Sequence, residues 1–241
     1  MSLAGRLARS SGLVVGAGGL GSPAALALAA AGVGRIGLVD EDRVDLSNLT
    51  RQLLHRGADV GRPKVESGAE RLRALAPAVE VVTHRARLGA PDAASLIAGY
   101  DVVVEGSDNL GTKLAVNEAC LQEGKPLVLG AILRCFGQVL TVLPGQTACA
   151  RCLYGGAPGD PLAASCGRAG VLGAVAGFIG MAQAAEALRL LAGRPPAWAG
   201  RLLTADLWRN TMGTAPLLPD PRCEACSSGA PKGAPSRMTI S

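Results

Sequence analysis

A glycine-rich turn near the start of the chain has the spacing of a phosphate-binding loop. Residues 16–21 read GAGGLG, between a short apolar run and an Ala- and Leu-rich stretch typical of a helix. In a G-x-G-x-x-G turn the first glycine permits the tight turn, the second lets the backbone approach a phosphate, and the third lets the helix pack closely on the strand. Free N–H groups at the start of that helix favour an anion. The pattern predicts a nucleotide site.

Acidic and basic side chains follow at the positions where such a site needs them. Asp40 ends the second apolar run, roughly 20 residues after the glycines, where a carboxylate can bond ribose hydroxyls. Arg51 comes next, and Lys64 stands at the start of an amphipathic helical stretch. A basic residue there opposes the helix dipole unless it serves an anion. We interpret Arg62 as solvated surface charge, whereas Arg51 and Lys64 together favour phosphate binding.

A further acidic position follows the apolar run 101–105. Ser107, Asp108 and Asn109 lie just beyond it, at a point where open α/β sheets bind ligands. A carboxylate there can hold Mg²⁺ between phosphates, because Mg²⁺ takes one or two acids together with substrate oxygens. A solvated turn is the equal alternative, and the spacing alone leaves the two open.

Four cysteines form two C-x-x-C pairs, Cys149 with Cys152 and Cys223 with Cys226. Four thiolates suit a closed, tetrahedral structural Zn²⁺ site. The alternatives are a redox dithiol or disulfides, but a cytosolic chain disfavours disulfides and neither pair has a thioredoxin-like position. We therefore expect Zn²⁺, which would join the last segment of the chain to its body.

The three remaining cysteines differ in their surroundings. Cys120 lies on a helical pattern and Cys135 near a strand start, so both are expected to be small core residues. Cys166 lies in the Gly-, Pro- and Ala-rich stretch 155–167, whose composition suits neither a core strand nor a core helix. A thiol in such surroundings is a candidate nucleophile.

The elements that must position these residues alternate between strands and helices. The expected strands are 13–15, 36–39, 80–82, 101–105, 126–129 and 202–208, and the expected helices are 65–75, 93–98, 113–122 and 171–192. This alternation predicts an α/β fold, with a Rossmann-like, doubly wound, mostly parallel sheet. A C-terminal β region held by zinc is expected to follow it.

Composition narrows the class of partner. The chain has 241 residues and a net charge of +5, enough length for one substantial core. Its basic residues are scattered, which suits an anionic ligand or an acidic partner better than nucleic acid. Glycines and Pro23 interrupt the apolar N-terminal stretch, which argues against a signal peptide. The apolar stretch 169–182 has about 14 residues, too few to span a membrane. We expect a cytoplasmic protein.

Three motifs carry a resemblance to a known family. GAGGLGSP, LVDEDRVDLSNLTRQLLH and VGRPKVE, in this order and spacing, closely resemble the HesA/MoeB/ThiF family, the bacterial relatives of ubiquitin-activating enzymes. The resemblance covers residues 11–226. It implies a single adenylation domain over residues 1–226, with a nucleotide-binding half at about 11–130 and a zinc-bearing half at about 131–226. A flexible tail is expected at 227–241.

The resemblance also implies an activity and its residues. Such enzymes use ATP, Mg²⁺ and Zn²⁺, and as homodimers they adenylate the C-terminal Gly-Gly of a small ubiquitin-like sulfur-carrier protein, for molybdopterin, thiamine or related biosynthesis. The implied catalytic residues are Arg51, Lys64, Asp108 and Cys166. The implied nucleotide contacts are Gly16, Gly18, Gly19, Gly21, Asp40, Asp42, Asn48, Arg51, Gln52, Lys64, Asp108 and Asn109, and the metal ligands are the four paired cysteines.

Two other functions share part of this pattern. An NAD(P)-dependent oxidoreductase would explain the glycines and Asp40, but not Arg51, Lys64 or the paired cysteines. A non-catalytic binding module that keeps the fold and the zinc is the third reading. The family's N-terminal R-Y-x-R-Q motif is not found here; Arg6 or Arg9 could stand in for it, but both lie closer to Gly16 than the family's spacing.

Overall fold

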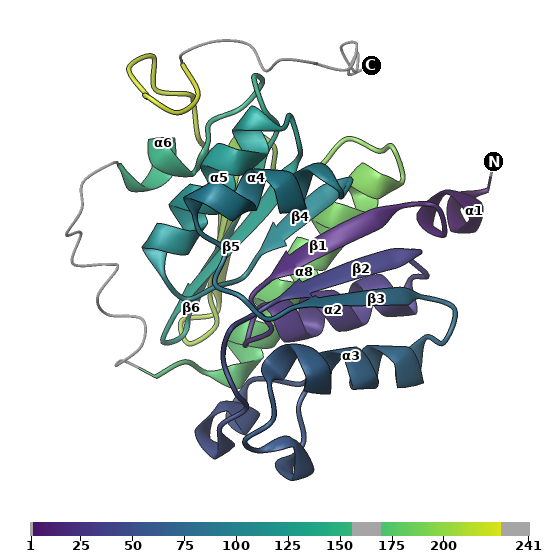
Figure 1. Cartoon of the computed structure of the whole chain (residues 1–241). Helices are drawn as coiled ribbons and strands as arrows, with labels where there is room; N and C mark the ends of the chain where they lie inside the picture. The colour runs from purple at the N-terminus through teal and green to yellow at the C-terminus, as the bar shows by residue number, and fades with distance from the viewer. Residues whose placement is uncertain (1, 156–169, 228–241) are drawn as a thin grey trace.

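Eight strands form one sheet in the computed structural model, which describes residues 2–155 and 170–227. The strand order is β3-β2-β1-β4-β5-β6-β7-β8, and Figure 1 labels the strands from β1 to β6. The strands are β1 (Ser11–Val15), β2 (Arg35–Val39), β3 (Glu80–His84), β4 (Val102–Glu105), β5 (Leu127–Leu133), β6 (Phe136–Val142), β7 (Arg201–Asp206) and β8 (Thr211–Pro216).

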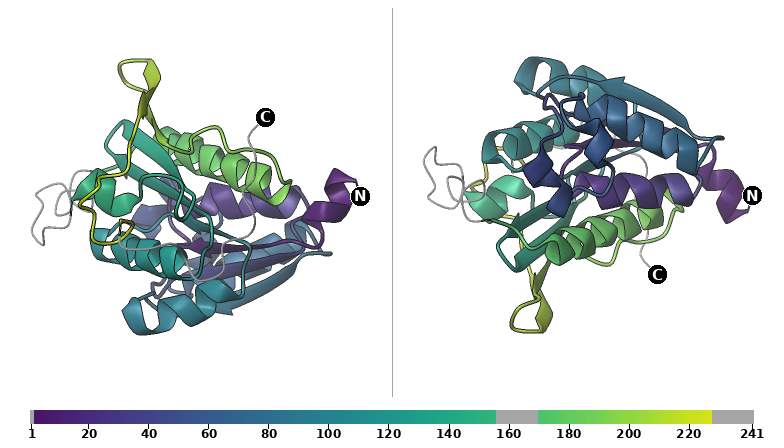
Figure 2. Two further views of the ribbon diagram at one scale, coloured as in Figure 1. Left: turned by 90° about the horizontal axis from the view of Figure 1, so that it is seen from above. Right: turned by 90° about the horizontal axis from the view of Figure 1, so that it is seen from below.

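Helices cover both faces of this sheet (Figures 1 and 2). The helices are α1 (Leu3–Leu7), α2 (Gly21–Ala30), α3 (Lys64–Leu75), α4 (Ala90–Ala98), α5 (Leu110–Gln122), α6 (Ala150–Tyr154) and α8 (Gly173–Leu191), with short 3-10 turns η1 (Leu46–Thr50) and η2 (Gly57–Asp59). Apolar residues of α2, α3 and α8 build the core on one face, and those of α4, α5 and α6 build the core on the other.

The central strand β1 shows why the parallel strands are continuous apolar runs. Leu13 and Val15 pack into the core on the α4–α5 side, while Val14 packs into the core beneath α2 and α8. A parallel sheet covered on both faces needs an apolar residue at every position. The pairings from β1 to β5 are parallel, which confirms the predicted Rossmann-like, mostly parallel sheet.

The second part of the sheet is antiparallel. β5, β6, β7 and β8 pair in sequence order, and a tight turn at Arg134 and Cys135 joins β5 to β6. Arg134 adopts a φ of 54°, in the left-handed region. All six residues of the edge strand β8 are exposed. β6 begins at Phe136, next to the strand start expected near Cys135, whereas β8 is not among the predicted strands, because it reads TMGTAP and has no apolar face for a pattern to detect.

Helix α8 packs against the sheet and against α2. By length and composition it could cross a membrane, although half of that stretch is buried inside the protein. Its contacts are those of a core helix: Gln183 Nε2 donates to the backbone carbonyls of Glu105 at 2.8 Å and Val128 at 3.0 Å. Glu186 Oε2 accepts a hydrogen bond from Thr141 Oγ1 at 2.8 Å. These buried polar contacts tie α8 to β4, β5 and β6.

Candidate functional site

A pocket opens at the carboxyl ends of β1, β2 and β4, where the strand order reverses. Open α/β sheets bind ligands at such a switch point. Most of the predicted nucleotide contacts line this pocket, namely Gly16, Gly18, Gly19, Asp40, Asp42, Arg51, Gln52, Lys64, Asp108 and Asn109. Gly21 and Asn48 do not line it.

The glycine-rich turn requires glycine at two of its positions. Gly16 has a φ of +89°, a conformation that side chains rarely adopt. A Cβ at Gly21 would overlap the carbonyl group of Gly16. The first turn of α2 therefore rests directly on the end of β1, which is the close packing that the sequence predicts for Gly21.

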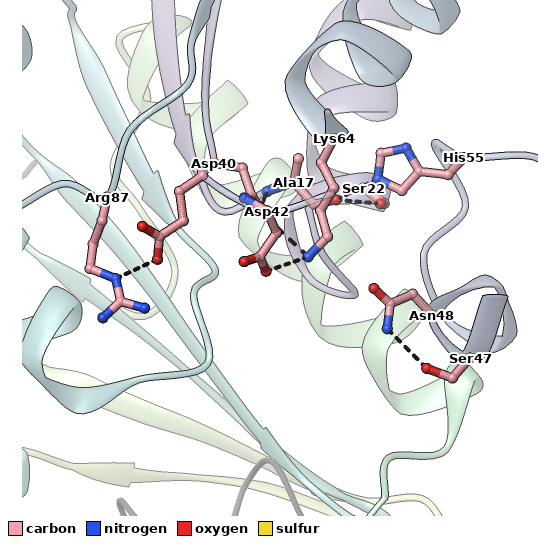
Figure 3. A network of polar contacts seen from close by, with 10 residues as sticks. Ala17, Ser22, Asp40, Asp42, Ser47, Asn48, His55, Lys64 and Arg87 are labelled. Atoms are coloured by element: carbon pink, nitrogen blue, oxygen red, sulfur yellow. Dashed lines mark hydrogen bonds and ion pairs between the residues drawn. The ribbon is translucent and has the colours of Figure 1, made fainter. Parts of the chain in front are cut away.

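Asp40 is held in place by backbone amides. Its Oδ2 accepts from the Ala17 N–H at 2.8 Å, and its Oδ1 accepts from the Asp42 N–H at 2.9 Å. The Lys64 ammonium lies 2.8 Å from Asp42 Oδ2 and 4.0 Å from Asp40 Oδ1 (Figure 3). A carboxylate has lone pairs left after two such bonds, so Asp40 can still accept from ribose hydroxyls.

Arg51 and Gln52 enter the pocket from the turn after η1. Gln52 is buried, and its Oε1 has no hydrogen-bond partner within the described part of the chain. A buried polar atom without a partner costs about 1–3 kcal/mol, so this oxygen is ready for a donor on a ligand. Arg51 forms no ion pair among residues 2–155 and 170–227. Asn48 lies at the edge, where its Nδ2 donates to Ser47 Oγ at 3.4 Å (Figure 3).

Asp108 lies in a loop whose ends are fixed. The Ser107 N–H donates to Glu105 Oε1 at 2.9 Å, just before it. Asn109 caps α5, because its Oδ1 accepts from the Thr112 N–H at 2.7 Å. Asp108 is exposed between these two anchors, with its carboxylate at the pocket. Asp108 is therefore available to a ligand, while the residues on either side of it make the hydrogen bonds that hold the loop.

Sequence reasoning missed the charged residues that support this loop. Glu105 and Lys113 form a buried ion pair, and Lys113 Nζ also donates to the Gly130 carbonyl at 2.7 Å. A glutamate that ends an otherwise apolar strand was the available signal. Arg87 also lines the pocket, and its Nε lies 2.6 Å from Glu41 Oε1.

His55 was likewise not predicted as a site residue. It is buried between the glycine-rich turn and α3, with Nε2 3.0 Å from the Ala17 carbonyl oxygen and Nδ1 2.9 Å from Ser67 Oγ. Burial lowers the pKa of His55 below its usual value, so the imidazole is neutral at neutral pH.

The four paired cysteines come together away from this pocket. Cys149 and Cys152 lie at the start of α6, and Cys223 and Cys226 lie in the turn after β8. The Sγ atoms of Cys149 and Cys223 are 3.7 Å apart, those of Cys152 and Cys226 are 3.5 Å apart, and all four lie within 4.8 Å of one another. Four thiolates at about 2.3 Å from one tetrahedral Zn²⁺ would be about 3.8 Å apart. The cluster therefore fits such an ion.

Of the other cysteines, Cys120 lies in the core, whereas Cys135, also expected there, is only partly buried against it. Cys120 is buried in α5, as predicted. Cys135 is half-buried in the turn between β5 and β6. Cys166 lies outside the described residues, as do residues 228–241 of the predicted tail.

Two relatives and one solved structure share this architecture. A protein of Aedes aegypti named adenylyltransferase and sulfurtransferase MOCS3 is 44% identical over 223 residues, which are 92% of this chain and 51% of that protein. The sulfur carrier protein adenylyltransferase of Thermus thermophilus is 43% identical over 226 residues, which are 92% of this chain and 83% of that protein. The crystal structure of E. coli MccB with MccA-N7isoASN has a TM-score of 0.82 at 19% identity, over 93% of this chain and 69% of that one.

These similarities differ in what they establish. At 19% identity the likeness to MccB shows the fold alone. The chain spans about half the length of several of the curated relatives that it matches. The ThiF family matches residues 2–226 of this chain, and these residues include nearly all of the described part. The chain therefore belongs to the ThiF family.

Proposed function

We propose that this protein is an ATP-dependent adenylyltransferase that activates the C-terminal glycine carboxylate of a small ubiquitin-like sulfur-carrier protein. The observation that carries the proposal is the gathering of Arg51, Lys64 and an exposed Asp108 around the glycine-rich turn in one pocket. This set, with Arg87 and Lys113 as further cations in the lining, suits a triphosphate with Mg²⁺ better than a dinucleotide. The names of the relatives, which are adenylyltransferases, support the same reaction.

The proposed reaction needs charge neutralisation more than acid–base chemistry. The carrier's terminal carboxylate is ionised at neutral pH, so no general base is required. One carboxylate oxygen attacks the α-phosphorus of ATP, the new acyl–phosphate bond forms, and the bond to the bridging oxygen breaks to release pyrophosphate. Carboxylate and triphosphate repel each other, so catalysis consists of alignment and compensation of charge.

The residues of the pocket divide these tasks. Arg51 and Lys64 would compensate phosphate charge, as would the N–H groups of the glycine-rich turn. Asp40 would accept from the ribose, and Asp108 would hold Mg²⁺, which supplies further positive charge when bound. The contacts proposed with the nucleotide are Gly16, Gly18, Gly19, Gly21, Asp40, Asp42, Asn48, Arg51, Gln52, Lys64, Asp108 and Asn109.

The cysteine cluster has a separate role in this proposal. Cys149, Cys152, Cys223 and Cys226 would hold a structural Zn²⁺, and four protein ligands leave no position for a water to activate. Cys166 is proposed as a nucleophile toward the activated carrier. We further propose a cytoplasmic homodimer whose residues 1–226 form one adenylation domain.

Pyrophosphate exchange tests the proposal. A carrier protein ending in Gly-Gly should allow labelled pyrophosphate to enter ATP, and no exchange is expected when that carrier is omitted. Mg·ATP should raise the Tm of the protein, as any ligand of the native state does, and NAD(H) should not. Stabilisation by NAD(H) alone would favour the oxidoreductase. Stabilisation by ATP without exchange would favour a binding module.

A further inference from the structure

The imidazole of His55 connects three elements around the nucleotide pocket. It stands in the turn after η1, its Nε2 lies 3.0 Å from the Ala17 carbonyl oxygen, and its Nδ1 lies 2.9 Å from Ser67 Oγ on α3. The side chains of His55 and Ser67 are both buried. His55 does not line the pocket, so any role in nucleotide binding must pass through a neighbour.

The partners of His55 settle where its proton lies. A carbonyl oxygen can only accept, so Nε2 carries the proton and donates to Ala17. Nδ1 of the neutral ring is then an acceptor, 2.9 Å from the Ser67 hydroxyl, which also hydrogen-bonds to the Asp59 carboxylate. Ser67 holds the imidazole in place from its Nδ1 side. It stands one turn after Lys64 on the same helix, so α3 positions both the turn and the pocket's ammonium group.

The bond to Ala17 has a consequence for the next residue. The C=O of Ala17 and the N–H of Gly18 belong to one peptide unit, which is trans and planar, so they point in opposite directions. With the carbonyl held toward His55, the Gly18 N–H points away from it. Gly18 lines the pocket, and its N–H donates to no backbone acceptor in the described part of the chain.

We propose that His55 is a positioning residue for the nucleotide: its Nε2–H fixes the Ala17–Gly18 peptide so that the Gly18 N–H is aimed at a phosphate group. Ser67 takes part by holding the ring of His55 in place on its Nδ1 side. The inference rests on the proposed nucleotide site, and adds a residue that acts on ATP without touching it. A purely structural histidine would stabilise the fold and leave nucleotide affinity unchanged.

Two substitutions at the same position separate these roles. The amide nitrogen of Gln can occupy the place of Nε2 and donate to Ala17, whereas the shorter Asn matches Nδ1 and cannot reach that carbonyl. His55→Asn should weaken the binding of Mg·ATP about tenfold, the scale of one lost hydrogen bond in a binding site. His55→Gln should restore the affinity to within about threefold of wild type. His84→Asn, the same change at the chain's other histidine, should leave it unchanged.

The measurement is calorimetry of Mg·ATP binding to the full chain, with the Tm of each variant recorded without nucleotide. Equal ATP affinity in His55→Asn and wild type, at whatever Tm, would overturn the inference. Equal losses in the Asn and Gln variants would also overturn it, because the donor would then not matter. If His55→Asn does not fold, Ser67→Ala decides: a loss of about threefold supports the role, and an unchanged affinity contradicts it. A wild-type chain that binds no Mg·ATP would instead overturn the proposed function.

Discussion

The parallel and antiparallel parts of the sheet carry their sites in opposite ways. Around β1, β2 and β4, backbone amides and a buried ion pair hold the pocket residues in place. Beyond β7 the segment has few buried contacts of its own, because β8 is fully exposed and the turn that follows it buries little besides Cys223. In the first region the fold holds the site, whereas in the second a metal site would hold the fold.

The largest expected effect is a loss of activity at the pocket around β1, β2 and β4, with the fold of that region unchanged. Asp108→Ala should lower pyrophosphate exchange by about 100-fold or more, the scale of losing one charge partner of a transition state. Mg·ATP binding should fall much less, because Arg51 and Lys64 remain. Asp92→Ala, an exposed aspartate in the first turn of α4, is the control and should keep wild-type exchange. Unchanged exchange in Asp108→Ala would mean that the magnesium site lies elsewhere.

The next largest effect should destabilise the segment beyond β7 and leave the pocket around β1, β2 and β4 intact. Cys226→Ala should lower the free energy of unfolding by more than about 2 kcal/mol, because metal binding is coupled to the order of the segments that it joins. Limited proteolysis should cut earlier after Asp206, while Mg·ATP binding persists. Cys135→Ala, at a half-buried cysteine outside the cluster, should change neither property.

Elemental analysis supplies the other half of this test. One Zn²⁺ per chain is expected in protein purified without chelator, and Cys226→Ala should lose it. If the purified protein contained no zinc, the two C-x-x-C pairs would be interpreted as redox dithiols instead.

Acid should act on the first region through its histidine. Burial lowers the pKa of His55 in the folded state, and Lys64 lowers it further, while the hydrogen bond to the Ala17 carbonyl and the nearby carboxylates of Asp59 and Asp40 act in the opposite direction. The unfolded state therefore binds more protons below about pH 6.5, so stability should fall as the pH drops from there to the folded pKa. The slope from one histidine cannot exceed about 1.4 kcal/mol per pH unit. Chemical denaturation at several pH values should show a shallower slope in His55→Gln.

The smallest effect on adenylation is expected from Cys166→Ser. Adenylation precedes any thiol chemistry, so pyrophosphate exchange should remain at the wild-type rate. A covalent adduct with the carrier, trapped without reductant, should disappear in the same variant. An adduct that survives would assign the nucleophile to another cysteine, with Cys135 as the next candidate.

The two regions also differ in how much the sequence predicts. The glycine-rich turn and the parallel strands are local signals, since each is a short run with its own spacing. The cysteine cluster joins residues 74 apart, yet two C-x-x-C pairs announce it without a fold. β8 gives no such signal, because none of its residues faces a core.

The supporting contacts of the pocket could not be read from spacing. His55 meets Ala17 across 38 residues, and Gln183 meets Glu105 across 78. Neither contact can be read from a motif, although His55 ends one, because each is made to a backbone carbonyl that any sequence possesses. The positions proposed to touch a nucleotide were therefore predictable, and those that orient them required the tertiary structure.

The position of α8 against the sheet has a consequence for folding while the chain is being synthesised. The carbonyls that Gln183 binds belong to β4 and β5, and α8 covers the core that these strands share with α2. The ribosome completes β1 to β5 before residue 173 has been made, so that apolar face is exposed when it first forms. A nascent chain paused near residue 150 should therefore recruit chaperones, and a fragment ending there should aggregate.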